Sequence, residues 1–202
     1  PWNFPLAILC GMAAAAAVTG NTVVMKPAEQ SSLVAKGLMD LMLEAGFPKD
    51  VIQFLPGLGE TVGDFLVKHP FTTTIAFTGS KSVGLQILQN SSVIQTHQNH
   101  VKRCLIEMGG KNALIIDSDA DLDEAVDGVL YSAFGFSGQK CSAASRVIVL
   151  EDVYDRFTQR LVEAARSIDQ LPAQNPQAHF GPVVDQDAFQ RINDLVEKYK
   201  TE

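Results

Sequence analysis

The sequence predicts an α/β protein in which parallel strands are flanked by helices. Short extended segments rich in β-branched residues alternate with helical segments along the chain. Gly and Pro residues separate one segment from the next, as expected between strands and helices. Such alternation is typical of βαβ units, whose strands pair in parallel. The 46% hydrophobic and 19% charged content is that of an ordinary globular protein.

The first half of the chain alternates strands and helices up to a Gly-Gly pair. The predicted strands are residues 22–26, 51–55, 73–77 and 103–107, and the predicted helices are residues 6–18, 33–45, 60–68 and 81–96. Ser31 or Ser32 is expected to cap the second helix, and Gly46 ends it. Gly109 and Gly110 break the chain after the last of these strands. We therefore expect one domain over residues 1–109 and another over residues 110–202.

The second half continues the same pattern. The predicted strands are residues 112–116 and 146–150, the predicted helices are residues 122–134, 153–168 and 187–201, and residues 136–144 form a loop. An acidic run from Asp119 to Asp123 is expected to cap the helix at 122–134. The chain starts without Met and stops inside a predicted helix, so we expect an internal fragment.

Composition limits the possible partners. The net charge of −7 argues against a nucleic-acid partner, which would favour a basic surface, so we expect a small-molecule substrate. The apolar stretch at 6–18 is too short to cross a bilayer. Three cysteines lack the density of a secreted disulfide scaffold, which favours the cytoplasm. His97 and His100 lie in a polar stretch without other ligand types, so we expect surface residues and no metal.

Cys141 is the candidate nucleophile. It lies in a loop of small residues beside Lys140, a setting that favours an exposed thiolate. An inert cysteine is the alternative, since free cysteines are usually small buried apolar residues. The local sequence leaves both readings open.

Two further residues have one catalytic and one structural reading. Glu107 is placed at the end of a predicted strand beside Gly109 and Gly110, where it could act as a general base or simply be solvated. Asn3 could donate a hydrogen bond to a ligand, or it could cap the helix that follows, and the two roles need not compete.

Two glycine-containing turns could bind phosphate. Residues 79–84 follow a strand and open a helix, an arrangement that suits a pyrophosphate. Residues 56–63 form a second glycine-rich turn. Neither has the spacing of the dinucleotide fingerprint, so each could also be a generic turn.

Five motifs occur in a characteristic order, namely PWNFP, KPAEQS, FTGSKSVG, EMGGK and GQKC. Over essentially its whole length the chain resembles the aldehyde dehydrogenase superfamily. The resemblance implies a Rossmann-like parallel sheet with flanking helices as the NAD-binding domain, followed by the first part of a second α/β domain that carries the nucleophile. It also implies a homo-oligomeric parent protein.

The resemblance assigns roles position by position. Cys141 matches the nucleophile, Glu107 the general base, and Asn3 the side-chain donor to the oxyanion. Lys26 and Glu29 match the pair that holds the adenosine ribose. The remaining matches to cofactor-binding positions are Trp2, Thr78, Gly79, Ser80 and Gly109.

Two longer segments, VKRCLIEMGGKNALIID and FGFSGQKCSAASR, are most similar to glutamate-semialdehyde (pyrroline-5-carboxylate) dehydrogenases. Such enzymes occur alone or within bifunctional proline-utilisation proteins. Lys140 and Ser142 could receive a substrate carboxylate through a cation and a hydroxyl donor, or could only be solvated. An aldehyde dehydrogenase of another substrate class, or a truncated nucleotide-binding module without turnover, stays open as an alternative.

Overall fold

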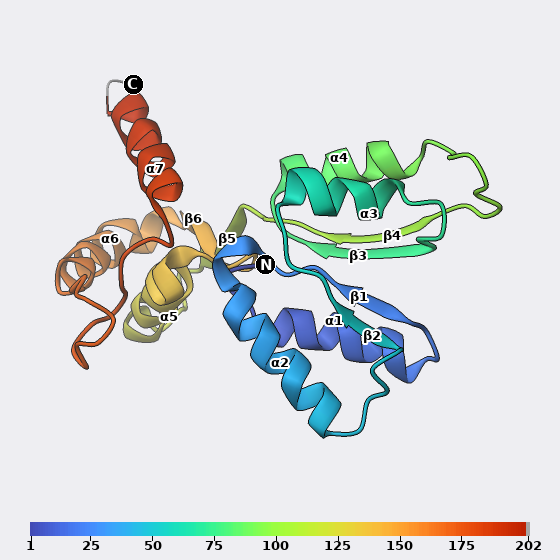
Figure 1. Cartoon of the computed structure of the whole chain (residues 1–202). Coiled ribbons are helices and arrows are strands. Elements are labelled where there is room, and N and C mark those ends of the chain that lie inside the picture. Colours follow the sequence, from blue (N-terminus) through green and yellow to red (C-terminus); the bar gives the residue numbers. More distant parts are fainter. Residues whose placement is uncertain (201–202) are drawn as a thin grey trace. The chain divides into compact units, whose positions relative to one another are not determined.

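The structure is a computed structural model that describes residues 1–200 of the 202-residue chain. The chain divides into two compact units, Pro1–Gly109 and Gly110–Glu202. The first unit contains two parallel strand pairs and the second contains one, with helices packed against them (Figure 1). The predicted α/β class with parallel strands and flanking helices is therefore confirmed.

The first strand pair of the first unit joins β1 (Val23–Met25) to β2 (Ile52–Phe54) in parallel. Helices α1 (Ala7–Val18) and α2 (Ser32–Glu44) supply the rest of this core. The buried apolar side chains of this core are Leu9, Ala13, Met25, Ala35, Leu38, Met39, Met42 and Ile52. Burying a side chain of the size of Ile or Met stabilises the fold by about 1.5–3 kcal/mol.

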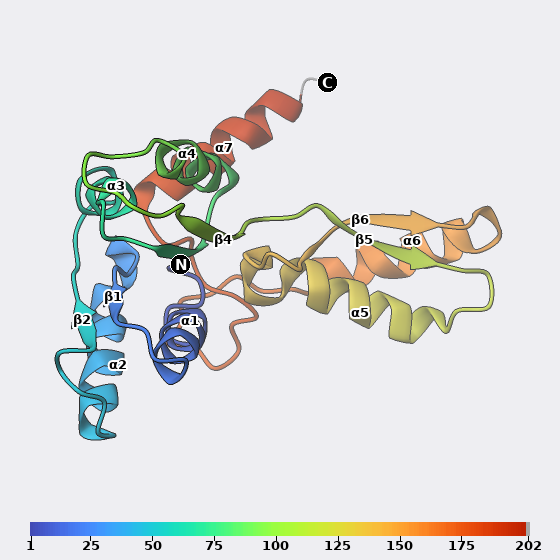
Figure 2. The same cartoon turned by 90° about the vertical axis from the view of Figure 1, so that its right-hand side faces the viewer.

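The second strand pair of this unit joins β3 (Thr74–Thr78) to β4 (Arg103–Glu107), in a register that pairs Thr78 with Glu107. Helices α3 (Asp64–Lys68) and α4 (Lys81–Ser91) lie on one face of this pair (Figures 1 and 2). Gly84 permits the close approach of α4, because a Cβ atom there would lie 2.8 Å from the Met108 sulfur.

The second unit pairs β5 (Asn112–Ile116) with β6 (Ala144–Val149). Helices α5 (Leu122–Phe134) and α6 (Glu151–Arg166) cover one face of the pair, as Figure 2 shows. Their enclosed core contains Ile116, Leu122, Val126, Val129, Val153 and Phe157. A further helix, α7, spans Gln186–Tyr199.

Asp121 begins α5 by accepting hydrogen bonds from the backbone N–H groups of Asp123 and Glu124. This confirms that the acidic run caps the helix. Ser31 is the N-cap residue of α2, one of the two predicted positions, but the expected capping bond is absent, because its hydroxyl donates back to the Ala28 carbonyl.

Several predicted bounds also differ from the structure. The helix predicted at 60–68 is a π-helical turn over Gly59–Gly63 followed by the short α3. The helix predicted at 81–96 ends at Ser91. The predicted loop at 136–144 contains a short helical turn, Gly135–Gly138, and reaches β6 at Ala144. Thr201, the predicted end of the last helix, lies outside the described residues.

Within residues 1–200, no helix combines the length and the apolar character needed to cross a membrane.

Candidate active site

The carboxyl end of β1 carries an ion pair beside a glycine-rich turn. Lys26 donates from Nζ to Glu29 Oε1 at 2.9 Å and to the Pro27 carbonyl at 2.9 Å. A Cβ atom at Gly59 would lie 3.8 Å from Glu29 Oε1, and one at Gly63 would lie 3.9 Å from the Lys26 side chain. Ligands in open α/β sheets bind outside the carboxyl ends of strands, where this pair lies.

The charge state of Glu29 follows from these contacts. Burial pushes the pKa of Glu29 upward, but the hydrogen bond and the charge of Lys26 and the backbone at Glu29 and Gly59 together bring it below 4.5. The carboxylate is therefore ionised near neutral pH and can accept hydrogen bonds from hydroxyl groups.

The turn between β3 and α4 presents a helix N-terminus. Ser80 caps α4, and its hydroxyl accepts a hydrogen bond from the N–H of Val83. The N–H of Gly79 donates to the Glu107 carbonyl at 3.1 Å. The N–H of Gly84 donates to the Ser80 carbonyl, so the expectation that this whole turn offers N–H groups to a phosphate is corrected for Gly79, Val83 and Gly84. The first-turn N–H groups of Lys81 and Ser82 have no carbonyl partner within the helix, and they can bind an anion.

Glu107 and Thr78 end the neighbouring strands β4 and β3, and the Glu107 side chain is exposed. The Thr78 hydroxyl contacts the Met12 sulfur of α1 at 3.9 Å. Gly109, also exposed, follows two residues after Glu107. The strand register thus holds a carboxylate and a hydroxyl-bearing residue at one sheet edge.

Trp2 and Asn3 precede α1 and are half-buried. The N-cap residue of α1 is Leu6, whose side chain makes no capping hydrogen bond. The helix-capping reading of Asn3 is therefore wrong, because the helix begins four residues later, after Pro5.

A left-handed turn precedes Cys141. Phe136 and Ser137 have φ values of 59° and 58°, and Gly138 follows with a φ of 65°. A Cβ atom at Gly138 would lie 2.5 Å from the Ala133 carbonyl oxygen, so glycine is required there. Non-glycine residues in this region cost roughly 1–3 kcal/mol each and concentrate at functional sites. Cys141 itself is exposed, so the inert buried reading does not describe its side chain.

Asn112, at the start of β5, holds the other side of this loop, and no local sequence pattern points to this residue. Its Nδ2 donates to the Cys141 carbonyl at 2.7 Å and to the Ala143 carbonyl at 3.2 Å. The β5–β6 register shifts at this point, since Asn112 pairs with Ala144 and Ala113 pairs with Arg146. The contact joins residues far apart in sequence, so no local pattern reveals it.

The two candidate carboxylate-binding residues flank Cys141. Lys140 Nζ donates to the Tyr131 carbonyl at 3.4 Å and lies 4.8 Å from the centroid of the Tyr131 ring. Ser142 is exposed. The ammonium is thus held by the last turn of α5, while the Ser142 side chain faces solvent.

The predicted site residues belong to both units. Cys141, Lys140 and Ser142 lie in the second unit. The candidate base, oxyanion donor and cofactor-binding residues all lie in the first unit. Among residues 1–200 no three potential ligands cluster to hold a metal. His97 is exposed as predicted, whereas His100 is half-buried and held by the Thr72 carbonyl at 3.1 Å.

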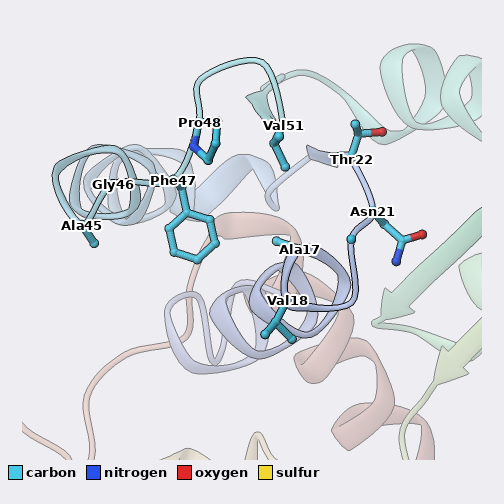
Figure 3. Close-up of a pocket in the computed structure, with 10 residues that line it drawn as sticks. Ala17, Val18, Asn21, Thr22, Ala45, Gly46, Phe47, Pro48 and Val51 are labelled. Atoms are coloured by element: carbon cyan, nitrogen blue, oxygen red, sulfur yellow. The ribbon is translucent and has the colours of Figure 1, made fainter.

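The first unit also contains an apolar hollow that none of its candidate site residues lines (Figure 3). It is lined by Ala17, Val18, Gly20, Asn21, Thr22, Ala45, Gly46, Phe47, Pro48 and Val51. These residues precede β1 and β2, whereas Lys26 follows β1. The hollow is therefore at the opposite end of this strand pair from the Lys26–Glu29 ion pair.

Comparison with known sequences identifies relatives over the full chain. The model of the aldehyde dehydrogenase family matches residues 1–202. The chain is 48% identical over 202 residues to 1-pyrroline-5-carboxylate dehydrogenase 1 of Halalkalibacterium halodurans. It is 43% identical over 202 residues to 1-pyrroline-5-carboxylate dehydrogenase of Bacillus subtilis. All of this chain is covered in both cases, and it spans 39% of the length of each relative.

Solved structures give the same result. Proline utilization A from Bdellovibrio bacteriovorus matches with a TM-score of 0.97 and 68% identity, over all of this chain and 21% of that one. The 1-pyrroline-5-carboxylate dehydrogenase from Thermus with bound NAD matches with a TM-score of 0.96 and 43% identity, over all of this chain and 39% of that one.

The resemblance seen in the five motifs is thus confirmed by sequence and by structure. Both comparisons extend across the two units, so neither unit is matched alone. The chain belongs to the aldehyde dehydrogenase family.

Proposed function

We propose that this chain is part of an NAD-dependent enzyme that oxidises an aldehyde to a carboxylic acid. The observation that carries the proposal is the exposed Cys141 thiol. Its loop follows a left-handed turn, and the Cys141 carbonyl accepts a hydrogen bond from Asn112. By analogy with the family, residues 1–109 are part of the NAD-binding domain. Residues 110–202 are the first part of the catalytic domain.

The first unit fits NAD. The ionised Glu29 carboxylate can accept hydrogen bonds from the adenosine ribose hydroxyls, and Lys26 lies beside it. The first turn of α4, capped by Ser80, suits a pyrophosphate. Thr78 and Gly109 are assigned to the nicotinamide end, and Gly79 and Trp2 complete the proposed contacts. When bound, NAD supplies the hydride acceptor of the reaction.

The chemistry follows from the residue types. The Cys141 thiolate adds to the aldehyde carbon, and the Asn3 amide and the Cys141 N–H stabilise the resulting oxyanion. Loss of a hydride from that adduct leaves a thioester on Cys141. Glu107 then takes a proton from water, which attacks the thioester and releases the carboxylic acid and the thiol.

The proposed substrate is glutamate semialdehyde, in the catabolism of proline. The 1-pyrroline-5-carboxylate dehydrogenases among the relatives support this choice. Ser142 offers a hydroxyl donor to the substrate carboxylate. Lys140 has three donors, so it can keep its contact with Tyr131 and also bind a carboxylate.

The test compares Cys141→Ala with the unmodified enzyme, both as complete proteins. NADH formation from glutamate semialdehyde should fall by more than about a thousandfold, because covalent catalysis requires its nucleophile. NAD affinity, measured by calorimetry, should stay unchanged. Cys10→Ala is the matched control, since Cys10 packs against the core of the first unit, and its activity should persist.

Glu107→Gln separates the two chemical steps. Thioester hydrolysis should slow by roughly a hundredfold or more, the usual scale for a positioned base. Mass spectrometry should then detect acyl-enzyme on Cys141. Retained turnover in Cys141→Ala would refute the assignment of Cys141 as the nucleophile. NAD binding without turnover in the unmodified protein would favour a nucleotide-binding module, and turnover of other aldehydes alone would favour another substrate class.

A further inference from the structure

The Asn112 side chain donates a hydrogen bond to the backbone carbonyl of Cys141, and the reaction as proposed does not use this bond. We propose that Asn112 is a positioning residue that orients Cys141 for attack. The inference rests on the proposed nucleophilic role of Cys141. It adds a specific requirement for one carboxamide at the start of β5.

The carboxamide bridges two carbonyls of the nucleophile loop. Nδ2 lies 2.7 Å from the Cys141 oxygen and 3.2 Å from the Ala143 oxygen. An amide nitrogen carries two hydrogens, so one group can serve both acceptors. Holding the Cys141 carbonyl restricts the backbone rotation that sets the direction of the Cys141 N–H and side chain. The N–H is the backbone donor proposed for the oxyanion.

Gly110 provides a second, independent observation at the same carbonyl. A Cβ atom at Gly110 would lie 3.1 Å from the Cys141 oxygen and 3.2 Å from Asn112 Nδ2. Both distances are tighter than ordinary van der Waals contact. The chain before β5 therefore packs directly against the hydrogen bond, and glycine makes this approach possible.

The loop is also restrained at other points. The left-handed turn over Phe136 and Ser137 fixes its approach to Cys141. The Ala144 N–H donates to the Ser132 hydroxyl of α5 at 3.1 Å. Restraint before and after Cys141, with its side chain left exposed, is the arrangement expected for a nucleophile that must be presented in one orientation.

A purely structural role is the competing explanation, because Asn112 also lies at the register shift between β5 and β6. That role predicts lower thermal stability with normal chemistry in the folded protein. A positioning role predicts altered chemistry at Cys141 at temperatures where the protein is fully folded. The two explanations therefore differ in what the folded enzyme does.

The experiment uses Asn112→Ala and Asn112→Asp in the complete protein. In Asn112→Ala, kcat for NADH formation at 25 °C should fall by roughly tenfold to a hundredfold, the scale of a small misplacement of reacting groups. NAD affinity should not change. Asn21→Ala is the matched control, since the Asn21 carboxamide also joins two acceptors, the Ala16 carbonyl and the Thr19 hydroxyl, and it lies far along the chain from Cys141.

Asn112→Asp provides a readout that does not require turnover. An aspartate cannot donate to the carbonyls, and a negative charge placed against the Cys141 backbone opposes a thiolate on the same residue. The pH midpoint for alkylation of Cys141 by iodoacetamide, followed by mass spectrometry, should move upward by about half a unit. Gly110→Ala should lower kcat in the same direction as Asn112→Ala. Gly128→Ala, at an open position of α5, should not.

A lower melting temperature with kcat and the alkylation profile unchanged within twofold would overturn the inference. If Asn112→Ala does not fold, Asn112→Asp and Gly110→Ala decide the question by the same criteria. Failure of the proposed function has a different signature, which is retained turnover in Cys141→Ala. In that case the alkylation profile still reports whether Asn112 controls the Cys141 thiol.

Discussion

Lys102 connects two elements of the first unit, and its removal should loosen the strand pair that carries Thr78 and Glu107. The side chain is 8% exposed and donates from Nζ to the Val67 carbonyl at 2.5 Å and to the His69 carbonyl at 2.8 Å. These carbonyls end α3, while Lys102 itself directly precedes β4. Lys102 thus ties the end of α3 to the start of β4.

The expected loss of stability in Lys102→Met follows from these contacts. Lys102→Met removes two hydrogen bonds from a group that can carry a charge, and it leaves two carbonyls without their donor. Each such bond contributes about 1.5–3 kcal/mol. Because the site retains slight exposure, water can reach the carbonyls, so the net loss should be roughly 2 kcal/mol. In hydrogen exchange limited by local opening, this loss corresponds to about 30-fold faster exchange.

The assay is hydrogen exchange of the complete protein followed by mass spectrometry. Peptides covering β3 and β4 should exchange faster in Lys102→Met, whereas peptides covering β5 and β6 should not change. Lys36→Met is the control, since it removes only an exposed ion pair with Asp40, a contact of small energetic value. Exchange of β3 and β4 within threefold of the unmodified protein would refute the argument.

The pH dependence provides a second check. Burial lowers the pKa of the Lys102 ammonium below 10.5, and the nearby Cys104 opposes this shift. The folded state therefore releases the proton at a lower pH than the unfolded chain does. Between these two pKa values the unfolded state binds more protons, so stability should rise with pH. Protection of β4, corrected for intrinsic exchange, should show this rise, and Lys102→Met should lack it.

Two further predictions concern the cofactor and the loop. NAD should be preferred over NADP, because the ionised Glu29 carboxylate accepts hydrogen bonds from ribose hydroxyls and repels a phosphate. Glu29→Gln should reduce the ratio of kcat/KM for NAD to kcat/KM for NADP by about tenfold. Equal kcat/KM values for the two cofactors in the unmodified enzyme would contradict this assignment. Gly138→Ala should destabilise the loop by about 1–3 kcal/mol and lower kcat, because φ is 65° and the Ala133 carbonyl blocks a Cβ atom. Hydrogen exchange over residues 133–141 and steady-state kinetics measure both effects, and an unchanged loop would show that the turn adapts freely.

The sequence predicted elements best where strong local signals bound them. Strand β4, strand β5 and helix α5 have the predicted bounds without any shift. Gly109 and Gly110 separate the two strands, and the cap at Asp121 fixes the start of the helix. The predicted helix at 60–68 was only half correct, because apolar spacing does not distinguish a π-helical turn from an α-helix.

The arrangement around Cys141 could not be predicted in the same way. Gly138 is visible in the sequence as a residue suited to positive φ, but Phe136 and Ser137 are not, since side chains of their type disfavour that region. Their conformation depends on tertiary contacts. The Asn112 bond to the Cys141 carbonyl is one such contact, and it joins residues 29 positions apart in the sequence.

Register links the fold to the candidate chemistry in both units. The β3–β4 register places Glu107 opposite Thr78 at the end of the pair, and the β5–β6 register places Asn112 opposite Ala144 at its start. A slip of one residue would move every side chain of a strand to the other face. Lys102 is the residue just before β4, and Asn112 is the first residue of β5. The side-chain hydrogen bonds of each therefore act where a short strand begins. Substitutions at the buried Lys102 and at the exposed Asn112 should therefore affect the reacting groups more than substitutions of helix residues with matching exposure, although neither side chain needs to touch the substrate.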